Sequence, residues 1–300
     1  MKRFINGITR IPVLGILLAT LIFTSCEKDN TISAEDVVNT LESMENDATA
    51  DYSYVSVTDD ALDIAMEGPR DNNFGFQSPS ASPRLAVGRV QACYIVTIDT
   101  GINGSNSFFP ARVTIEFKDS CRGRDGIKRK FKIITEYTGI MRVKDSKATT
   151  RFENFYIDDT INVTGTHILT NVSQNNIPAF QRVVEKGRLT FASGRWIERN
   201  FNRTTTMSKG SSTLEKSDDE FTTTGTGNGS NSRGKTWTHS ITQGLLRKND
   251  CFRTSYFAPV SGVISFTHNA SVGSIDYGDG TCDRKAILTI NGSSREITLR

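Results

Sequence analysis

The chain has few of the residue types that usually carry chemistry. Its 300 residues include only three histidines, five cysteines, two tryptophans and seven prolines. It lacks a G-x-S-x-G nucleophile motif, an H-E-x-x-H zinc motif and a glycine-rich phosphate-binding loop. His167, His239 and His268 have no metal-binding partner at ligand spacing, so we interpret them as surface residues. We therefore expect no enzyme activity, no cofactor and no metal site.

The scarcity of proline and of low-complexity repeats argues against an extended stalk. Hydrophobic residues make up 36% of the chain and aromatic residues 9%, with 17 phenylalanines, which supplies material for a core. At this length the chain can form one large domain or two smaller ones.

The N-terminus has the three parts of a secretory signal. Basic residues precede an apolar run over 11–23, and the small residues Thr24 and Ser25 lead to Cys26. The apolar run is too short to span a bilayer stably as a mature helix. Residues 1–25 are therefore expected to be a cleaved signal peptide.

The end of this segment, Phe23-Thr24-Ser25-Cys26, resembles a bacterial lipobox, although Phe23 stands where leucine is usual. The resemblance implies cleavage before Cys26, a diacylglyceryl thioether on its sulfur and an acylated amine, which together anchor the protein in a membrane. The acidic stretch after Cys26, residues 27–29, is similar to the surface-export signal of Bacteroidota lipoproteins. It implies an outer-membrane lipoprotein exposed at the cell surface.

Charge is divided unevenly along the mature chain. Residues 27–67 hold twelve acids and one base, whereas residues 68–300 carry an excess of bases. We expect the acidic segment to lie on its own basic body. The alternative is a basic surface for an anionic partner, such as lipopolysaccharide or an anionic glycan.

The mature chain divides into three parts. Residues 26–67 are expected to form a tether and an acidic helical segment, which starts near the capping residue Ser33, with a second helical piece over 59–66. Residues 68–84, which contain three prolines, are a linker. Residues 85–300 alternate apolar and polar residues between turn dipeptides and form the β domain.

The predicted fold is mainly β: a large antiparallel meander, either a sandwich or an open half-barrel, with a short N-terminal helical segment. Residues 112–118 show the alternation most clearly, with Val113, Ile115 and Phe117 on one face. Residues 210–233 are poor in large apolar side chains, and we interpret them as a long hairpin tip or mobile loop.

Once Cys26 carries lipid, four cysteines remain in an oxidising compartment. A weak internal repeat relates residues 93–135 to residues 251–290, and each unit begins with one cysteine and contains a second one further along. Among the three possible pairings the repeat favours two local disulfides, which are Cys93–Cys121 and Cys251–Cys282.

A basic stripe follows the second cysteine of the first unit. Its possible anion-binding members are Arg122, Arg124, Lys128, Lys130 and Lys132. The simpler interpretation is the wet face of a half-buried strand, with Phe131 and Ile133 on the dry face. An anion-binding surface is the alternative, and the export signal argues against nucleic acid.

Two further features have structural and functional interpretations. Residues 276–283 contain three aspartates, but their spacing fails the EF-hand pattern, so we expect a tight turn. We interpret the isolated residues Trp196 and Trp237 as side chains that pack within the protein rather than as rings that stack on sugars.

The function favoured by the sequence is that of a lipid-anchored lipoprotein with a binding or envelope-structural role. One alternative is a carrier of lipid or lipoprotein built on an open half-barrel. The other is an enzyme that acts on glycans, which needs two carboxylates about 5–10 Å apart.

Overall fold

The architecture comes from a computed structural model. It describes residues 35, 38–44, 46–48, 50, 53, 87–90, 93–105, 107–122, 127–213, 215–254, 258–269, 271–283 and 285–299. Cys26, Arg124, the linker at 68–84 and the expected helical piece at 59–66 lie outside the described residues.

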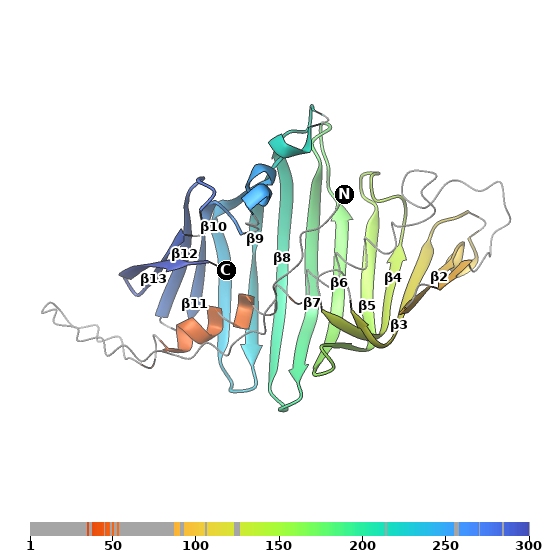
Figure 1. Ribbon diagram of the computed structural model, residues 1–300, viewed down its shortest axis with the longest axis horizontal. Helices are drawn as coiled ribbons and strands as arrows, with labels where there is room; N and C mark the ends of the chain where they lie inside the picture. Colours follow the sequence, from red (N-terminus) through yellow and green to blue (C-terminus); the bar gives the residue numbers. More distant parts are fainter. Residues whose placement is uncertain are drawn as a thin grey trace, which may run out of the picture.

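The described strands form one antiparallel sheet of fourteen, ordered as they occur in the chain (Figure 1). Its first half contains β1 (Val87–Val90), β2 (Tyr94–Asp99), β3 (Ala111–Arg122), β4 (Lys128–Tyr137), β5 (Lys147–Ile157), β6 (Ile161–Asn171) and β7 (Ala179–Phe191). Its second half contains β8 (Trp196–Lys209), β9 (Glu220–Asn231), β10 (Thr236–Lys248), β11 (Ser261–His268), β12 (Ser271–Asp279), β13 (Lys285–Ile290) and β14 (Ser293–Thr298). In the described parts of the connections there are three short 3-10 helices: η1 (Ile102–Gly104), η2 (Lys216–Asp218) and η3 (Asn249–Thr254).

The predicted antiparallel meander is confirmed, and the sheet is open rather than two stacked sheets. Each strand of the order pairs with its neighbours in sequence, as antiparallel hairpins allow. No helix among the described residues is long and apolar enough to cross a membrane.

The two faces of the sheet differ sharply. We call one the dry face, where alternate residues such as Ile115, Ile133, Val163, Leu189 and Phe266 are buried. We call the other the polar face, where most of the intervening residues are charged, hydroxyl-bearing or amide side chains, with Val272 and Ile287 among the exposed apolar exceptions. This alternation follows from the two-residue period of a strand.

A helical segment, seen in residues 35, 38–44, 46–48, 50 and 53, lies across the dry face in front of β9–β11 (Figure 1). Met44 is buried, and Thr40 donates a hydrogen bond from Oγ1 to Ser271 Oγ, 2.8 Å away. Gly273 of β12 makes room here, because a Cβ at that position would crowd Thr40 and Met44. The segment therefore covers part of the sheet core.

Residues 210–233 correct one prediction. Residues 220–231 form β9 in the middle of the sheet, whereas the described residues of 210–219 lie in the β8–β9 connection, which contains η2. Gly227 and Gly229 are small because rings from β10 lie over them: a Cβ would overlap with His239 at the first and with Trp237 at the second. Sequence alone shows the missing side chains but not the rings that fill their place.

Candidate functional site

A buried polar cluster joins the helical segment to the centre of the sheet. We call it the Asp47 cluster, and it consists of Asp47, Arg199, Arg203, Trp237 and His239. The Asp47 carboxylate lies 3.0 Å from Arg199 Nε and 3.1 Å from Arg199 Nη2, and the Arg199 side chain has no exposed surface. Trp237 Nε1 donates to Asp47 Oδ1 over 3.3 Å, and His239 Nδ1 lies 3.0 Å from the same oxygen.

The strands place these groups together by alternation. Arg199 and Arg203 are four residues apart on β8 and point to the dry face, and Phe201 lies between them. The two guanidinium carbons lie 4.7 Å and 5.4 Å from the centre of the Phe201 ring. Arg203 Nη2 is 4.0 Å from Asp47 Oδ2, so one carboxylate faces two cations.

These contacts fix the protonation of the cluster. Burial raises the pKa of Asp47, but Arg199, the His239 hydrogen bond and Arg203 together outweigh it, so the pKa lies below the usual aspartate value. Burial also lowers the pKa of His239, against the opposing influence of Asp47. His239 is thus neutral near pH 7, with its Nδ1 hydrogen toward Asp47 and Nε2 accepting from Arg203 Nη2 at 3.3 Å.

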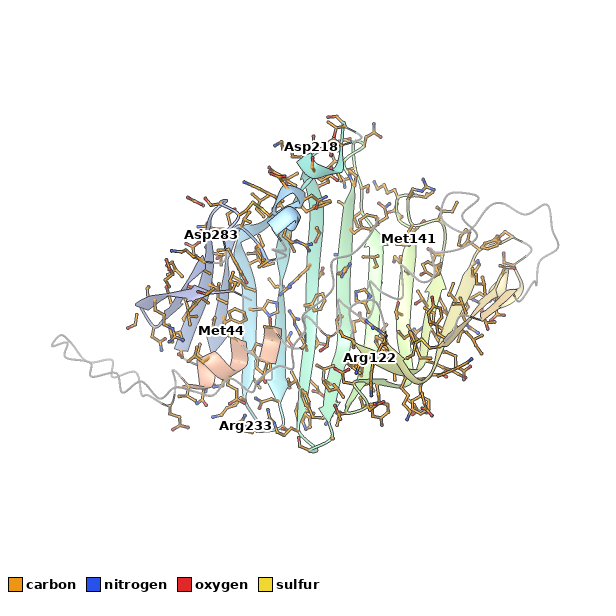
Figure 2. All side chains as sticks on the ribbon, viewed as in Figure 1. Met44, Arg122, Met141, Asp218, Arg233 and Asp283 are labelled. Atoms are coloured by element: carbon orange, nitrogen blue, oxygen red, sulfur yellow. A yellow bond between two sulfur atoms is a disulfide. The ribbon has the colours of Figure 1, made fainter. Side chains whose placement is uncertain are left out.

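A second acid supports the same docking. Glu42 Oε1 lies 2.8 Å from Arg233 Nη2 and accepts a hydrogen bond from Asn231 Nδ2 at 3.0 Å. Figure 2 shows Arg233 at one end of the long central strands and Asp218 at the other. The expectation that the acidic segment lies on the basic body is confirmed for Glu42 and Asp47.

The histidines correct another prediction, because all three are buried rather than on the surface. His268 Nδ1 donates a hydrogen bond to the carbonyl of Thr236, and His239 belongs to the Asp47 cluster. Burial, with a smaller effect of Arg182, lowers the pKa of His167 to about 3. The polar residues beside these histidines in sequence point to the opposite face and gave no sign of their burial.

A groove on the polar face crosses β8, β9, β10 and the end of β11. It encloses about 540 Å³, and its polar lining consists of Glu198, Asn200, Asn228, Ser230, Thr236, Thr238, Thr267 and Asn269. We call it the neutral groove, because Glu198 is its one ionisable side chain and is paired with Arg188, 3.1 Å away. Sequence reasoning missed it because the lining comes from four strands whose register is not visible in the sequence.

The two predicted disulfides are present. Cys93–Cys121 and Cys251–Cys282 have Cα separations of 5.1 Å and 5.4 Å, inside the usual range of about 4.4–6.8 Å. Each joins a residue before one hairpin, β2–β3 or β11–β12, to a residue at the end of that hairpin. The two bridges therefore close corresponding hairpins toward the two sides of the sheet.

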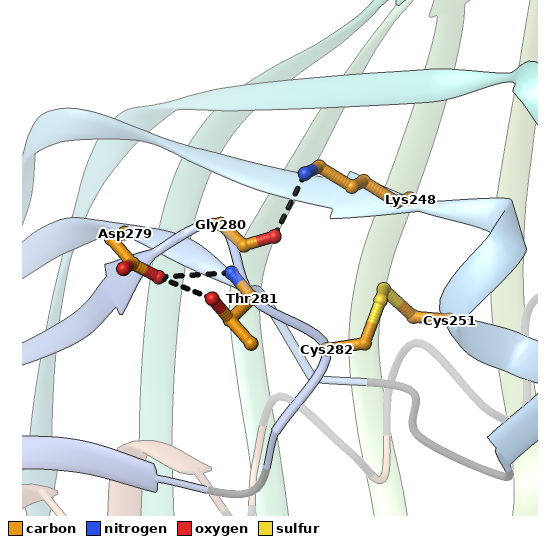
Figure 3. The surroundings of a disulfide bond; sticks show 6 residues. All are labelled: Lys248, Cys251, Asp279, Gly280, Thr281 and Cys282. Carbon is orange, nitrogen blue, oxygen red and sulfur yellow. Dashed lines mark hydrogen bonds between the residues drawn. A yellow bond between two sulfur atoms is a disulfide. The ribbon is translucent and has the colours of Figure 1, made fainter.

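Figure 3 shows the turn beside the second bridge. The carboxylate of Asp279 accepts hydrogen bonds from the backbone nitrogen of Thr281 at 3.0 Å and from its hydroxyl at 2.7 Å. Lys248 Nζ donates to the carbonyl of Gly280 over 2.7 Å. The aspartates cap backbone groups, as predicted for a tight turn, and no group of three metal-ligating side chains gathers within the described residues.

The basic stripe is balanced by acids where the structure describes it. Lys128, Lys130 and Lys132 lie 3.3 Å, 3.1 Å and 3.9 Å from carboxylates of neighbouring turns and strands, which belong to Asp159, Asp119 and Glu116. Arg122 is exposed at the end of β3. Anion binding by this stripe stays a prediction.

Phe131 departs from the predicted strand pattern. It is 41% exposed instead of pointing to the dry face, because a bulge with φ of 69° interrupts the pairing of β4 with β5 between Lys130 and Lys132. Ile133 is buried as predicted.

Neither tryptophan presents a bare ring for stacking. Trp237 is buried in the Asp47 cluster. Trp196 is half-buried beneath the Arg188 guanidinium, whose carbon lies 4.4 Å from the ring centre. The packing interpretation therefore holds for both.

Comparison with known proteins gives no match to this chain, whether with family models, curated proteins or solved structures.

Proposed function

We propose that this protein is a lipid-anchored lipoprotein of the outer membrane, exposed at the cell surface, with a binding or envelope-structural role and no catalytic one. The observation that carries the proposal is the asymmetry of the open sheet. Its dry face is filled with its own side chains and the helical segment, while its polar face is open across many strands. A large exposed face on a rigid sheet suits binding or assembly.

The position of the helical segment supports anchoring close to the membrane. Glu35 is helical and nine residues beyond Cys26. At about 3.3–3.6 Å per residue, an extended tether of that length reaches at most about 30 Å. Because Glu42 and Asp47 fix the segment to the sheet, a lipid on Cys26 would hold the sheet within that distance of the bilayer.

The filled dry face favours this role over a carrier of lipid. A carrier needs an apolar cavity, whereas Phe117, Phe155, Phe201 and Phe266 are buried against other apolar residues of the sheet. For a glycan-cleaving enzyme, the adjacent carboxylates of Asp158 and Asp159 offer no support, because they occupy the β5–β6 turn with positive φ angles.

Intact-mass spectrometry and detergent phase partitioning test the anchor. The wild-type protein should carry acyl chains on the N-terminal cysteine and enter the detergent phase, and Cys26→Ala should do neither. Ser25→Ala is the matched control, because it keeps a small residue before the cysteine and should still be lipidated. An unmodified Cys26, or a Cys26→Ala protein that still partitions into detergent, contradicts the proposal.

Surface labelling of intact cells with a membrane-impermeant amine reagent tests the orientation. Labelled lysines of the body support exposure, and labelling only after the outer membrane is opened contradicts it. Native mass spectrometry of the detergent-extracted protein tests the binding role by detecting molecules that co-purify.

A further inference from the structure

The polar face has an uncharged strip over most of β10–β12, with ion pairs such as Arg188–Glu198 and Lys285–Glu296 on the strands to either side. Over β3–β5 it carries ion pairs such as Arg112–Glu136, with 2.8 Å between Nη2 and Oε1, and Lys132–Glu116 at 3.9 Å. Residues 236–246 of β10 and 261–275 of β11–β12 contain no lysine, arginine, aspartate or glutamate. The cores of contact surfaces are depleted of charged residues, so an exposed strip without them is a candidate contact surface.

The neutral groove overlaps the uncharged strip at β10 and β11 and has an ordered lining. Strand pairing sets Asn200, Asn228, Thr238 and Thr267 in one row across β8–β11. A second row beside it contains Glu198, Ser230 and Thr236. Neighbouring strands are about 4.8 Å apart, so each row offers a polar group at intervals close to the width of a sugar ring.

Several of these groups are available to a ligand. Asn200 is fixed, because its Oδ1 accepts from Lys186 N at 2.7 Å and its Nδ2 donates to Asn228 Oδ1 at 3.2 Å. Because Asn228 takes part in this bond through its Oδ1, its amino group is not used by Asn200. Among the described residues, the hydroxyls of Thr236, Thr238 and Thr267, like that of Ser230, have no hydrogen-bond partner within the protein.

The lining selects among ligand classes. An anionic polymer needs lysine or arginine, but the groove's one ionisable residue is Glu198. A lipid needs apolar walls, and a protein partner needs aromatic or aliphatic anchors, whereas the outward side chains here are hydroxyls, amides and a paired carboxylate. Hydroxyls and amides both donate and accept hydrogen bonds, as do the hydroxyls of sugars.

We propose that the neutral groove binds an uncharged glycan along the rows of polar side chains that cross β8–β11. The volume of about 540 Å³ lies within the range of ligand sites, about 300–1,000 Å³. This inference deepens the proposed binding function by naming the ligand class and does not depend on how the protein is anchored.

Affinity electrophoresis of the detergent-solubilised full chain tests the proposal. The gels contain a neutral polysaccharide (mannan, xylan, dextran or mixed-linkage β-glucan) or an anionic one (heparin or polygalacturonate). At least one neutral polysaccharide should retard the wild-type protein. Thr238→Ala and Asn228→Ala should each weaken that binding about three- to tenfold, the effect of losing one hydrogen-bonding group. Thr238→Lys, which fills the groove and adds charge, should abolish it.

Thr224→Ala is the matched control, because Thr224 is an exposed threonine of β9 outside the groove. It should bind like the wild type, and all variants should keep the wild-type melting temperature. The proposal is overturned if no neutral polysaccharide retards the protein, if only anionic ones do, or if the groove variants bind as tightly as Thr224→Ala. Detergent partitioning of the same protein reports on the anchor separately, so the two proposals can fail independently.

Discussion

Replacing Asp47 by asparagine should release the helical segment from the sheet. Asparagine is nearly the same size but removes the charge that faces Arg199 and Arg203, so the buried Arg199 and the partly buried Arg203 lose their anionic partner. Removing one partner of a buried ion pair typically costs about 3–5 kcal/mol. The segment can also detach while the sheet stays folded. The loss in the free energy of unfolding therefore cannot exceed the free energy with which the segment docks on the sheet. Burial of Met44 contributes about 1.5–3 kcal/mol to that docking.

We therefore expect Asp47→Asn to lower the free energy of unfolding by about 3 kcal/mol, at the low end of the range for buried pairs. Hydrogen exchange read by mass spectrometry should show faster exchange in residues 38–48, while β4–β7 stay protected. Glu42→Gln is the control, because its partner Arg233 is 56% exposed and such pairs are worth about 0–1 kcal/mol. Exchange and urea unfolding of Asp47→Asn that match those of Glu42→Gln would refute the reasoning.

The pH dependence of this contact has a defined sign. The pKa of Asp47 is lowered in the folded protein, so its stabilising effect is present above the unfolded value of about 3.9 and is lost as the pH falls through the folded pKa. The docking should accordingly be insensitive to this carboxyl between pH 5 and pH 8, and the acid-induced loss should be absent in Asp47→Asn.

Three other predictions address stability. The pKa of His167 is about 3 in the folded protein, against 6.5 in the unfolded chain, so below pH 6.5 the unfolded chain binds one proton more than the folded protein. The free energy of unfolding should therefore fall by about 1.4 kcal/mol for each pH unit below 6.5. Urea midpoints measured from pH 7 to pH 5 should show this slope in the wild type and a smaller slope in His167→Gln. Gly229→Ala should cost about 1–3 kcal/mol because its methyl group meets the Trp237 indole, and a double mutant with Trp237→Leu should lose less than the sum of the two single changes. Replacing Cys251 and Cys282 by serine should lower stability by about 3–4 kcal/mol, measured by thermal unfolding, and an unchanged melting temperature would show that the bridge constrains little.

Local patterns predicted much of this fold. Alternation over residues 112–118 identified the dry face of β3, and the spacing of four cysteines within a repeat identified both disulfides. These features depend on residues that are close in sequence. The turn at 276–283 was predictable for the same reason, since Asp279 bonds to Thr281 two positions away.

Features that depend on distant residues were not predictable. Asp47 meets Arg199 and Trp237 across 152 and 190 residues, and no pattern in either region points to the other. β9 was mistaken for a loop because its glycines are explained only by rings on β10. The neutral groove could be recognised only from the register of four strands, because a one-residue slip of any strand would turn its lining residues to the opposite face.

The order of strands in the sheet has a consequence for the sequence of events in folding. Each strand of the order β1–β14 pairs with its sequence neighbours, so hairpins can form in succession with short loop closures. The helical segment is the exception: it is synthesised early, yet its sites on β8 and β10 follow more than 150 residues later. Docking of the segment is therefore a late event, because β8, β9 and β10 must pair before the surface that receives Asp47 exists.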